Sequence, residues 1–294
     1  MTDELRIDER PQLERPVLIA AFRGWNDGGQ GASLAGAYLA QAWAAERFAE
    51  IESEDFYDFQ ATRPMVSLVD GVTRRIDWPE NTFLHAPLPG GGRDAIILLG
   101  VEPNLRWRTF SERVTTLATT FGVELVITLG SLLADVPHTR PAPVTGSATD
   151  PELIRQLGLQ ASRYEGPTGI VGVLHDACGR AGLKSASLWA AVPHYVSLAP
   201  SPRAALALCQ RLGELIGAPV DTAELEEAVE AYNEQVSEAV AADAETQAYV
   251  EELEQRSDVL EQHIPSGDSL AAELTRFLRE RENGSDGDDA AREQ

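Results

Sequence analysis

The sequence predicts a three-layer α/β/α fold with a mixed sheet over residues 10–220. Continuous apolar runs, typical of strands buried on both faces, alternate there with amphipathic or Ala-rich segments of helical length. Shorter segments of alternating polarity lie between them. Parallel strands joined by crossover helices explain the apolar runs, and edge or antiparallel strands explain the alternating segments. The region is therefore expected to form one domain.

The first half of the chain provides two of the buried strands. The run PVLIAAF at 16–22 is the first, and a Gly-rich loop leads from it into a helix at about 29–45. The run AIILLG at 95–100 is the second, and a helix at 105–121 follows it. Three alternating segments between the two runs are predicted as edge or antiparallel strands: 51–59, 73–78 and 81–89.

The second half repeats the alternation of strand and helix. A third buried run at 124–137 is followed, after a long connection, by a predicted helix at 168–182. A strand at 185–196 and a helix at 202–217 complete the domain. Proline opens this last helix and glycine closes it, which is the usual asymmetry of helix ends.

Residues 221–282 are predicted to form an acidic helical segment outside the domain. Apolar residues recur there at spacings of three and four, as they do on one narrow face of a helix: Leu225, Val229, Tyr232 and Val236, then Val250, Leu253, Leu260 and Ile264. This face must pack on the α/β domain, on itself or on another subunit. The polar tail at 283–294 is expected to be disordered.

The charge of the chain lies mostly in this segment and tail. The 294 residues contain 47 acids and 24 lysines plus arginines, a net charge of −23. Residues 221–294 hold 22 acids and 5 bases, a net of −17, whereas the first 220 residues hold 25 and 19, a net of −6. Such a charge argues against nucleic acid and anionic membranes as partners and leaves basic protein surfaces as a candidate.

Other sequence features favour a cytoplasmic protein without cofactor or metal. No run approaches the roughly 20 apolar residues of a membrane-spanning helix, and the charged start does not have the pattern of a signal peptide. Cys178 and Cys209 form no CxxC or other metal pattern and are expected to be buried free thiols. No two histidines have the spacing of a metal pair, so no metal site is expected.

The loop GWNDGGQGAS at 24–33 is the first candidate site, because it joins a buried strand to the start of a helix. Its amides could hold an anion. The alternative is a tight structural turn, in which Asp27 caps the helix and Trp25 packs under it. The loop has neither the dinucleotide-binding nor the P-loop pattern, and the two interpretations stay open.

Polar residues also follow the second and third buried strands. Glu102 and Arg106 lie where ligands bind in open α/β sheets, although a salt bridge between them is the simpler explanation. The third strand ends in GSLLADVPHTRP, which places Ser131, His138 and Arg140 near the same edge. Asp135 completes the residue types of a hydrolase triad, but Ser131 lacks the GxSxG pattern. A simpler interpretation is that Ser131 donates a hydrogen bond to an oxyanion.

A further Gly-bounded loop, EGPTG at 165–169, leads into the helix at 168–182. Thr168 could cap that helix, and Glu165 could contact a ligand or simply be a surface charge. His175 and His194 are expected to be structural histidines. If the loops line one pocket, its candidate residues are these: Trp25, Asp27, Glu102, Arg106, Ser131, His138, Arg140, Glu165 and Thr168.

Six segments together resemble a known family. In order they are PVLIAAFRGWNDGGQGAS, LLGVEPNLRW, GSLLADVPHTRPAPVTGSA, YEGPTGIVGVLHDACGRAG, SLWAAVPHYVSLAPSPRAALAL and IPSGDSLAAELTRFL. Over residues 14–280 the chain resembles the proteasome assembly chaperone 2 family in its bacterial branch. The resemblance implies a phosphorylase/hydrolase-like fold and homo-oligomers, with a trimer as one candidate. Eukaryotic members of the family help to assemble the core proteasome particle, and some archaeal members are linked to proteasome function.

The resemblance supplies no catalytic residues. Some family labels describe ATP-grasp enzymes, but Lys184 is the only lysine in the chain, so the lysine-rich nucleotide site expected there is missing. Kinship of fold does not transfer activity. The leading expectation is a non-enzymatic oligomeric scaffold, or a proteasome-assembly-chaperone-like protein, with self or proteasome-related partners. The alternative is an enzyme or sensor that holds a phosphate- or carboxylate-bearing ligand at the carboxyl edge of the sheet.

Overall fold

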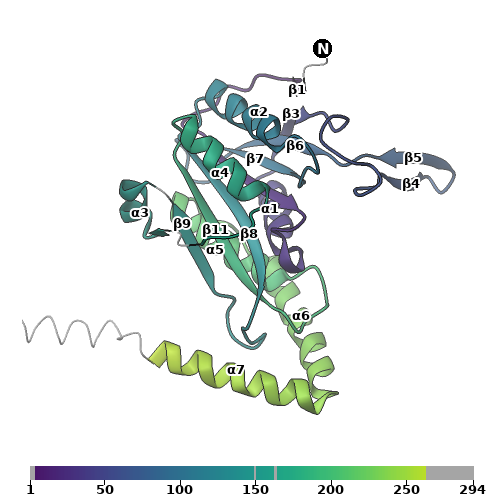
Figure 1. The fold of residues 1–294 in the computed structure, drawn as a ribbon, viewed down its shortest axis with the longest axis vertical. Coiled ribbons are helices and arrows are strands. Elements are labelled where there is room, and N and C mark those ends of the chain that lie inside the picture. The colour runs from purple at the N-terminus through teal and green to yellow at the C-terminus, as the bar shows by residue number, and fades with distance from the viewer. Residues whose placement is uncertain (1–3, 149, 162–163, 263–294) are drawn as a thin grey trace, which may run out of the picture.

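A mixed sheet is the centre of the computed structural model, which describes residues 4–148, 150–161 and 164–262 (Figure 1). Among these residues, nine strands pair in the order β1-β3-β6-β7-β2-β8-β11-β9-β10. In that order the strands are β1 (Leu5–Ile7), β3 (Glu46–Ile51), β6 (Asn81–Pro87), β7 (Asp94–Val101), β2 (Val17–Arg23), β8 (Leu125–Ala134), β11 (Ser185–Pro193), β9 (Val144–Ala148) and β10 (Gln160–Ala161).

Four neighbouring strands, β7, β2, β8 and β11, are parallel to one another. Their carboxyl ends therefore lie at one edge of the sheet, and the loops that the sequence singled out follow them. Strands β6, β3 and β1 extend one side by antiparallel pairing, and β9 pairs antiparallel to β11 on the other side. The predicted mixed sheet is confirmed.

Helices cover both faces of this sheet. Helices α1 (Gly31–Ala42) and α5 (Pro202–Ile216) pack together on one face, and α2 (Trp107–Thr120) and α4 (Ile170–Arg180) pack together on the other. Successive residues of β2 alternate between these two cores, with Ile19 facing α1 and α5, and Leu18 facing α2 and α4. This double burial explains why β2 is a continuous apolar run, and it confirms the three-layer α/β/α class.

An aromatic cluster fills the core on the α2 and α4 side. The ring centroids of Phe22 and Phe110 are 5.9 Å apart, and those of Phe56 and Phe110 are 5.5 Å apart, both in edge-to-face geometry. Phe56 belongs to the segment 51–59, where the sequence predicted a strand. That prediction was wrong, because β3 ends at Ile51 and the following turns carry Phe56 and Tyr57 into the core.

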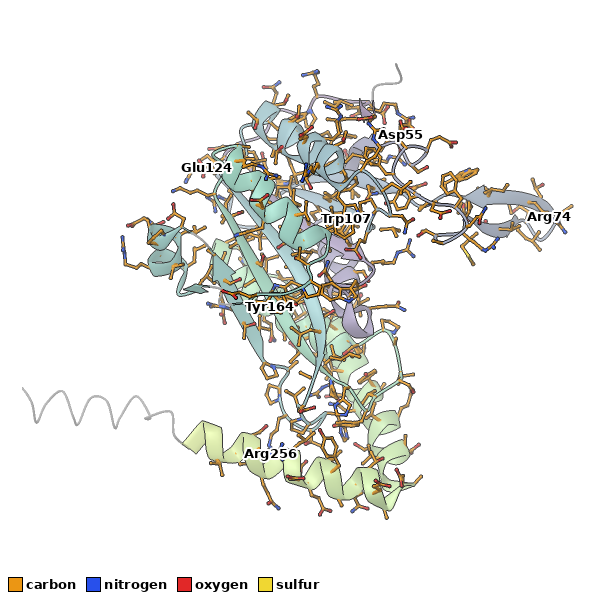
Figure 2. All side chains as sticks on the ribbon, viewed as in Figure 1. Asp55, Arg74, Trp107, Glu124, Tyr164 and Arg256 are labelled. Carbon is orange, nitrogen blue, oxygen red and sulfur yellow. The ribbon has the colours of Figure 1, made fainter. Side chains whose placement is uncertain are left out.

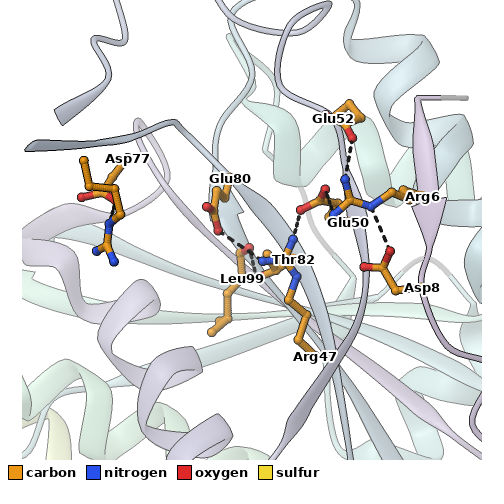
Figure 3. Close-up of polar contacts among 10 residues, drawn as sticks. Arg6, Asp8, Arg47, Glu50, Glu52, Asp77, Glu80, Thr82 and Leu99 are labelled. Atoms are coloured by element: carbon orange, nitrogen blue, oxygen red, sulfur yellow. Dashed lines mark hydrogen bonds and ion pairs between the residues drawn. The ribbon is translucent and has the colours of Figure 1, made fainter. Parts of the chain in front are cut away.

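A salt-bridge network holds the outer edge of the sheet at β1. The guanidinium of Arg6 lies 2.5 Å from a carboxylate oxygen of Glu50 and 3.1 Å from one of Glu52, and it also pairs with Asp8 (Figure 3). Arg47 joins Glu50 to Glu80 in the same region. Because most of these side chains are exposed, each pair stabilises the fold only slightly.

Two helices follow the domain, α6 (Ala223–Ala241) and α7 (Ala244–Gln262). Leu225 joins the core below α5, whereas Tyr232, Val236, Val240 and Val250 form a second cluster with Tyr195 and Val196. The apolar face of this segment therefore packs on its own α/β domain, one of the three expected arrangements. The rest of the predicted segment, at 263–282, and the tail at 283–294 lie outside the described residues. None of the described helices is long and apolar enough to span a membrane.

Some elements have no counterpart in the sequence prediction. They are β1, β3, β9, α3 (Pro151–Leu157) and β10, together with the first strand of one hairpin, whose second strand matches the predicted segment 73–78. This hairpin consists of β4 (Met65–Val69) and β5 (Thr73–Asp77), which pair with each other and not with the main sheet. It projects from the body of the molecule (Figure 1). It leaves the sheet between the end of β3 and the start of β6, at the carboxyl edge of the parallel strands.

Phe110→Ala tests the aromatic core. The side chain is fully buried, so its removal should lower the free energy of unfolding by about 3–5 kcal/mol. Urea denaturation followed by circular dichroism measures the change. Val72→Ala on the hairpin is the control, because Val72 is 83% exposed and its truncation should change stability by no more than about 0.5 kcal/mol. Equal losses in the two variants would contradict this account of the core.

Candidate functional site

The carboxylate of Asp27 occupies the start of α1. Its Oδ1 accepts the backbone N–H groups of Ala32 at 2.9 Å and Ser33 at 3.1 Å, and its Oδ2 accepts the Ser33 hydroxyl at 2.6 Å. These amides are the donors that an external anion would use at a helix N-terminus. The chain's own carboxylate already satisfies them, as the structural interpretation of this loop requires.

Ser131 reinforces the same junction from β8. Its hydroxyl oxygen accepts the N–H of Ala32 at 3.2 Å and lies 3.4 Å from Oδ1 of Asp27, and its backbone N–H donates to Asn26 at 2.9 Å. The residue is only 1% exposed. Ser131 therefore links β8 to the start of α1 and is not available as a nucleophile at a surface.

Glu102 connects three segments at the carboxyl edge. It follows β7, and its Oε2 accepts the N–H of Trp25 at 3.0 Å. Its Oε1 accepts the N–H of Ile170, the first residue of α4, at 2.8 Å, and the side-chain amide of Asn26 at 3.4 Å. One carboxylate thus satisfies donors after β2 and at the start of α4, where a negative charge also interacts favourably with the helix dipole.

Two glycines make room for this carboxylate. A Cβ at Gly24, whose φ is +145°, would lie 2.7 Å from Cβ of Glu102. A Cβ at Gly169 would lie 2.2 Å from the amide nitrogen of Asn26 and 2.6 Å from Oε1 of Glu102. Both positions need the absence of a side chain. The glycines of two sequence motifs therefore serve close packing around Glu102.

Three sequence-based expectations at this edge need correction. Trp25 does not pack under the turn, because its side chain is 64% exposed. Arg106 pairs with Glu4 at 2.5 Å and with Asp55 at 3.0 Å rather than with Glu102, since the loop carries it toward β1. Thr168 is not the N-cap of α4, because Gly169 has that position and Glu102 accepts the first amide of the helix, that of Ile170.

His138 lies in a different place, in the connection between β8 and β9 and against α6. Its Nδ1 is 2.9 Å from the hydroxyl of Tyr195, and its Nε2 is 3.1 Å from the hydroxyl of Ser237 on α6. Burial lowers the pKa of His138, the guanidinium of Arg203 lowers it further, and Glu254 opposes the shift. Both ring nitrogens are engaged here and neither contacts Ser131, so the residues do not form a catalytic triad.

Arg140 fixes the same connection to α7. Its guanidinium makes a two-pronged contact with Asp258, at 2.9 and 3.0 Å. The nearby Thr139 hydroxyl donates to Glu254. The hydrogen bonds from Arg140 also lower the pKa of the Asp258 carboxyl. Paired arginine and carboxylate groups of this geometry give directional contacts. The predicted site residues His138 and Arg140 are therefore part of the contact that holds the C-terminal helices on the domain.

Arg203 is a residue of this contact that the sequence analysis did not select. It is buried at the start of α5, donates to Asn233 of α6 at 2.7 Å, and hydrogen-bonds the backbone carbonyl of Arg140. Tyr249 of α7 extends the contact through Asp135 at 3.2 Å and through the ring of His194. The only signal in the sequence was its place directly after the helix-opening proline.

The nine candidate residues do not line one pocket. Asp27, Glu102 and Ser131 lie together at the carboxyl edge, and Trp25 lies exposed beside them. Glu165 and Thr168 lie in the loop before α4, Arg106 faces β1, and His138 and Arg140 face the C-terminal helices. A hollow of about 380 Å³ on the α1 side contains none of the nine and is lined partly by Arg23, Ser33, Leu34, Glu80 and Leu99. No group of residues in the described ranges has the composition of a metal site.

The carboxyl edge exposes several large apolar side chains among its polar ones. Large hydrophobic side chains are exposed in the connections or strand ends after four parallel strands: Trp25 after β2, Leu105 after β7, Leu132 and Leu133 at the end of β8, and Leu198 after β11. Tyr164, in the loop before α4, is exposed as well (Figure 2). The other large exposed hydrophobics of the described residues belong to the β4–β5 hairpin, with its flanking Trp78, and to Val259 of α7. Apolar exposure on several connections of one sheet edge favours a protein interface there.

The fold and this edge define a three-layer α/β/α domain in which the chain's own side chains occupy the usual anion-binding positions. The chain belongs to the PAC2 family, whose model matches residues 21–240. The resemblance of the sequence to this family is thereby confirmed. A comparison with curated proteins found no match.

Solved structures agree with this assignment. A PAC2 family protein from Streptomyces avermitilis is 48% identical, with a TM-score of 0.75, over 80% of this chain and 99% of that one. A proteasome-assembly chaperone homologue from Mycobacterium tuberculosis is 46% identical, with a TM-score of 0.73 and the same coverage. The archaeal proteasome activator PbaB of Pyrococcus furiosus, 21% identical with a TM-score of 0.65, shares the fold over 80% of this chain and 97% of its own.

Glu102→Gln tests the linking carboxylate. The amide of glutamine places an N–H group against one of the two backbone donors, so the variant should lose about 1–3 kcal/mol of unfolding free energy. Chemical denaturation at pH 7 measures this. Glu165→Gln is the matched control, since Glu165 is exposed and should tolerate the change within about 0.5 kcal/mol. Equal stability of Glu102→Gln and the unaltered protein would contradict the role given to Glu102.

The lowered pKa of His138 predicts a loss of stability in mild acid. The unfolded chain binds the proton at about pH 6.5, more readily than the folded chain does. The stabilising contribution is therefore complete above about pH 6.5 and is lost as the pH falls through the lower, folded-state pKa. Urea denaturation between pH 7 and 5 should show this decline, and His138→Gln should flatten it.

A second histidine refines this test. Burial also lowers the pKa of His175, so part of the decline should persist in His138→Gln. A His138→Gln variant with the same pH dependence as the unaltered protein would rule out titration of His138 as a cause.

Proposed function

We propose that the protein is a non-enzymatic, oligomeric scaffold related in role to proteasome-assembly chaperones, and that it works through protein contacts at the carboxyl edge. The observation that carries this proposal is the apolar exposure of that edge. At or after the ends of four different strands lie Trp25, Leu105, Leu132, Leu133 and Leu198, each more than 40% exposed. Their burial against a protein would remove apolar surface from water, the main driving force of association.

The polar groups of the edge support the same proposal. The Asp27 carboxylate, the Ser131 hydroxyl and the Glu102 carboxylate all contact donors of the chain itself. A catalytic or ligand-binding edge would instead keep such groups directed at a substrate. His138 and Arg140, the other candidates for chemistry, hold the C-terminal helices. No arrangement of nucleophile, base and orienting group remains among these residues.

The class of partner follows from charge and from the relatives. We propose self-association as the first interaction, with the domain at 10–220 supplying rigidity and the helical segment at 221–282 supplying interface. The relative at 46% identity is described as a proteasome-assembly chaperone homologue, which makes proteasome-related proteins in the cytoplasm the second class of partner. A net charge of −23 favours basic surfaces on such partners.

Leu133→Asp tests the carboxyl edge as an interface. The side chain is 56% exposed, so the substitution should leave the fold intact. A charge in the interface should weaken association at least tenfold, which is about 1.4 kcal/mol. Light scattering across a dilution series measures this, and Leu133→Met is the control, because it keeps an apolar side chain at the same position. Unchanged association of Leu133→Asp would remove Leu133 from the interface, and a monomeric unaltered protein would overturn the oligomeric scaffold.

A thermal-shift panel tests the absence of a small-molecule function. Inorganic phosphate, nucleotides and amino acids are the probes, because they carry the anionic groups that the carboxyl edge could have held. A ligand at 100 times its dissociation constant would stabilise the folded protein by about 2.7 kcal/mol. We expect no shift with any of them. A saturable shift that is lost in Arg23→Ala, in the hollow beside α1, would contradict the scaffold and establish a ligand site.

A further inference from the structure

The hairpin formed by β4 and β5, with its flanks at residues 63–78, is the most exposed apolar feature of the molecule. Its strands bond only to each other, and seven of its large apolar side chains are exposed: Met65, Val66, Leu68, Val69, Val72, Ile76 and Trp78. An isolated two-stranded hairpin is marginally stable at best in water. Burial of this apolar surface against another protein surface would therefore stabilise the hairpin.

One face of the hairpin is the apolar one. The register pairs Val66 with Ile76 and Leu68 with Arg74, so these four side chains share a face. Trp78 continues this alternation. The ring centroids of Trp78 and Phe59 are 4.8 Å apart, and this contact anchors the base of the hairpin to the body. The face thus combines three aliphatic side chains with one arginine.

The hairpin is also a basic projection from an acidic chain. Residues 63–78 hold three arginines and two aspartates, a net of +1, against −23 for the whole protein. Arg75 pairs with Asp77 within the hairpin, whereas Arg74 makes no ion pair with any residue in the described ranges. Figure 2 shows Arg74 near the end of the hairpin and directed away from the body. A surface that covers this face must therefore supply acids as well as apolar groups.

The outer face of α6 has the complementary character. Glu227, Glu230, Glu234 and Glu238 recur at spacings of three and four, on the side of the helix opposite the buried Leu225, Tyr232 and Val236. We call these four residues the glutamate stripe. All four are exposed, and none forms an ion pair with a residue that the structure describes. Like charges four residues apart destabilise a helix, so a basic surface over the stripe would stabilise α6.

We infer that the hairpin of one copy of this chain docks on the outer face of α6 of a second copy, with Arg74 over the glutamate stripe. The inference rests on the proposed function, because it requires self-association. The two surfaces match in length, since the stripe spans about 16 Å and a strand of five or six residues spans about 16–20 Å. Ala231, exposed beside the stripe, leaves apolar surface for the aliphatic side chains of the hairpin.

Charge and geometry both favour α6 of a second copy over other contacts between copies. The hairpin lies apart from α6 of its own chain, so the contact is made in trans (Figure 1). Packing of two hairpins face to face would give Arg74 no acid to pair with, because the face consists of Arg74 and aliphatic side chains. Docking on α6 supplies the acids. It joins different surfaces on the two copies and therefore generates a closed ring when the rotation between copies permits closure.

Charge reversal tests the contact. Arg74→Glu combined with Arg75→Glu should weaken self-association at least tenfold, measured by light scattering across a dilution series. Glu230→Arg combined with Glu234→Arg should have the same effect. All four substitutions in one chain restore opposite charges and should restore the mass of the unaltered protein. Arg10→Glu with Arg108→Glu is the control, since both arginines are exposed, lie outside the hairpin, and change the net charge equally.

The outcomes separate this inference from the proposed function. An unaltered protein that is monomeric at every concentration would overturn both. An oligomer that keeps its mass with Arg74→Glu and Arg75→Glu would overturn the docking alone. The same conclusion would follow if the variant with all four substitutions did not regain the mass of the unaltered protein. Disulfide trapping gives a second measurement, because Cys178 and Cys209 are buried. Mixed Val72→Cys and Glu234→Cys proteins should cross-link, whereas self-linking of Val72→Cys alone would show hairpin-to-hairpin contact instead.

Discussion

The carboxylate of Glu102 is the contact on which the carboxyl edge of this fold depends. It accepts backbone donors from the loop after β2 and from the first turn of α4, so one side chain at the end of β7 positions both. The close approach explains why Gly24 and Gly169 have no side chain. Asp27 and Ser131 make a similar junction between β8 and α1. The ends of three parallel strands are thereby fixed by hydrogen bonds within the chain.

This internal bonding determines what the edge can do. Parallel α/β sheets commonly bind ligands at their carboxyl edge because amides, helix dipoles and polar side chains converge there. Here the same groups converge, but carboxylates of the chain take the place of the ligand. Several large apolar side chains are left in solvent, and these interact with protein surfaces better than with small anions. The fold thus retains the architecture of a binding edge while presenting a surface suited to association.

The periodicity of the sequence predicted the parallel strands and the helices on both faces, because burial on two sides leaves continuous apolar runs in β2, β7 and β8. Sequence alone did not predict the segment at 51–59, where Phe56 and Tyr57 enter the core from turns rather than from a strand. The candidate site was harder to predict from the sequence than the fold. Ser131 and His138 are near in sequence, yet β8 carries one into the sheet and the following connection carries the other to α6. Their separation in space depends on the path of the backbone, which their spacing in the sequence does not reveal.

The acidity of the C-terminal helices has two different structural contexts. Asp258 and Glu254 of α7 face the domain and meet Arg140 and Thr139, so their charge contributes to packing in cis. The glutamates on the outer face of α6 have no such counterpart among the described residues, and the apolar side of the same helix is already buried. Their spacing of three and four is what an amphipathic helix imposes on its exposed residues. This face is therefore a solvated acidic surface, to which a basic partner surface would be attracted.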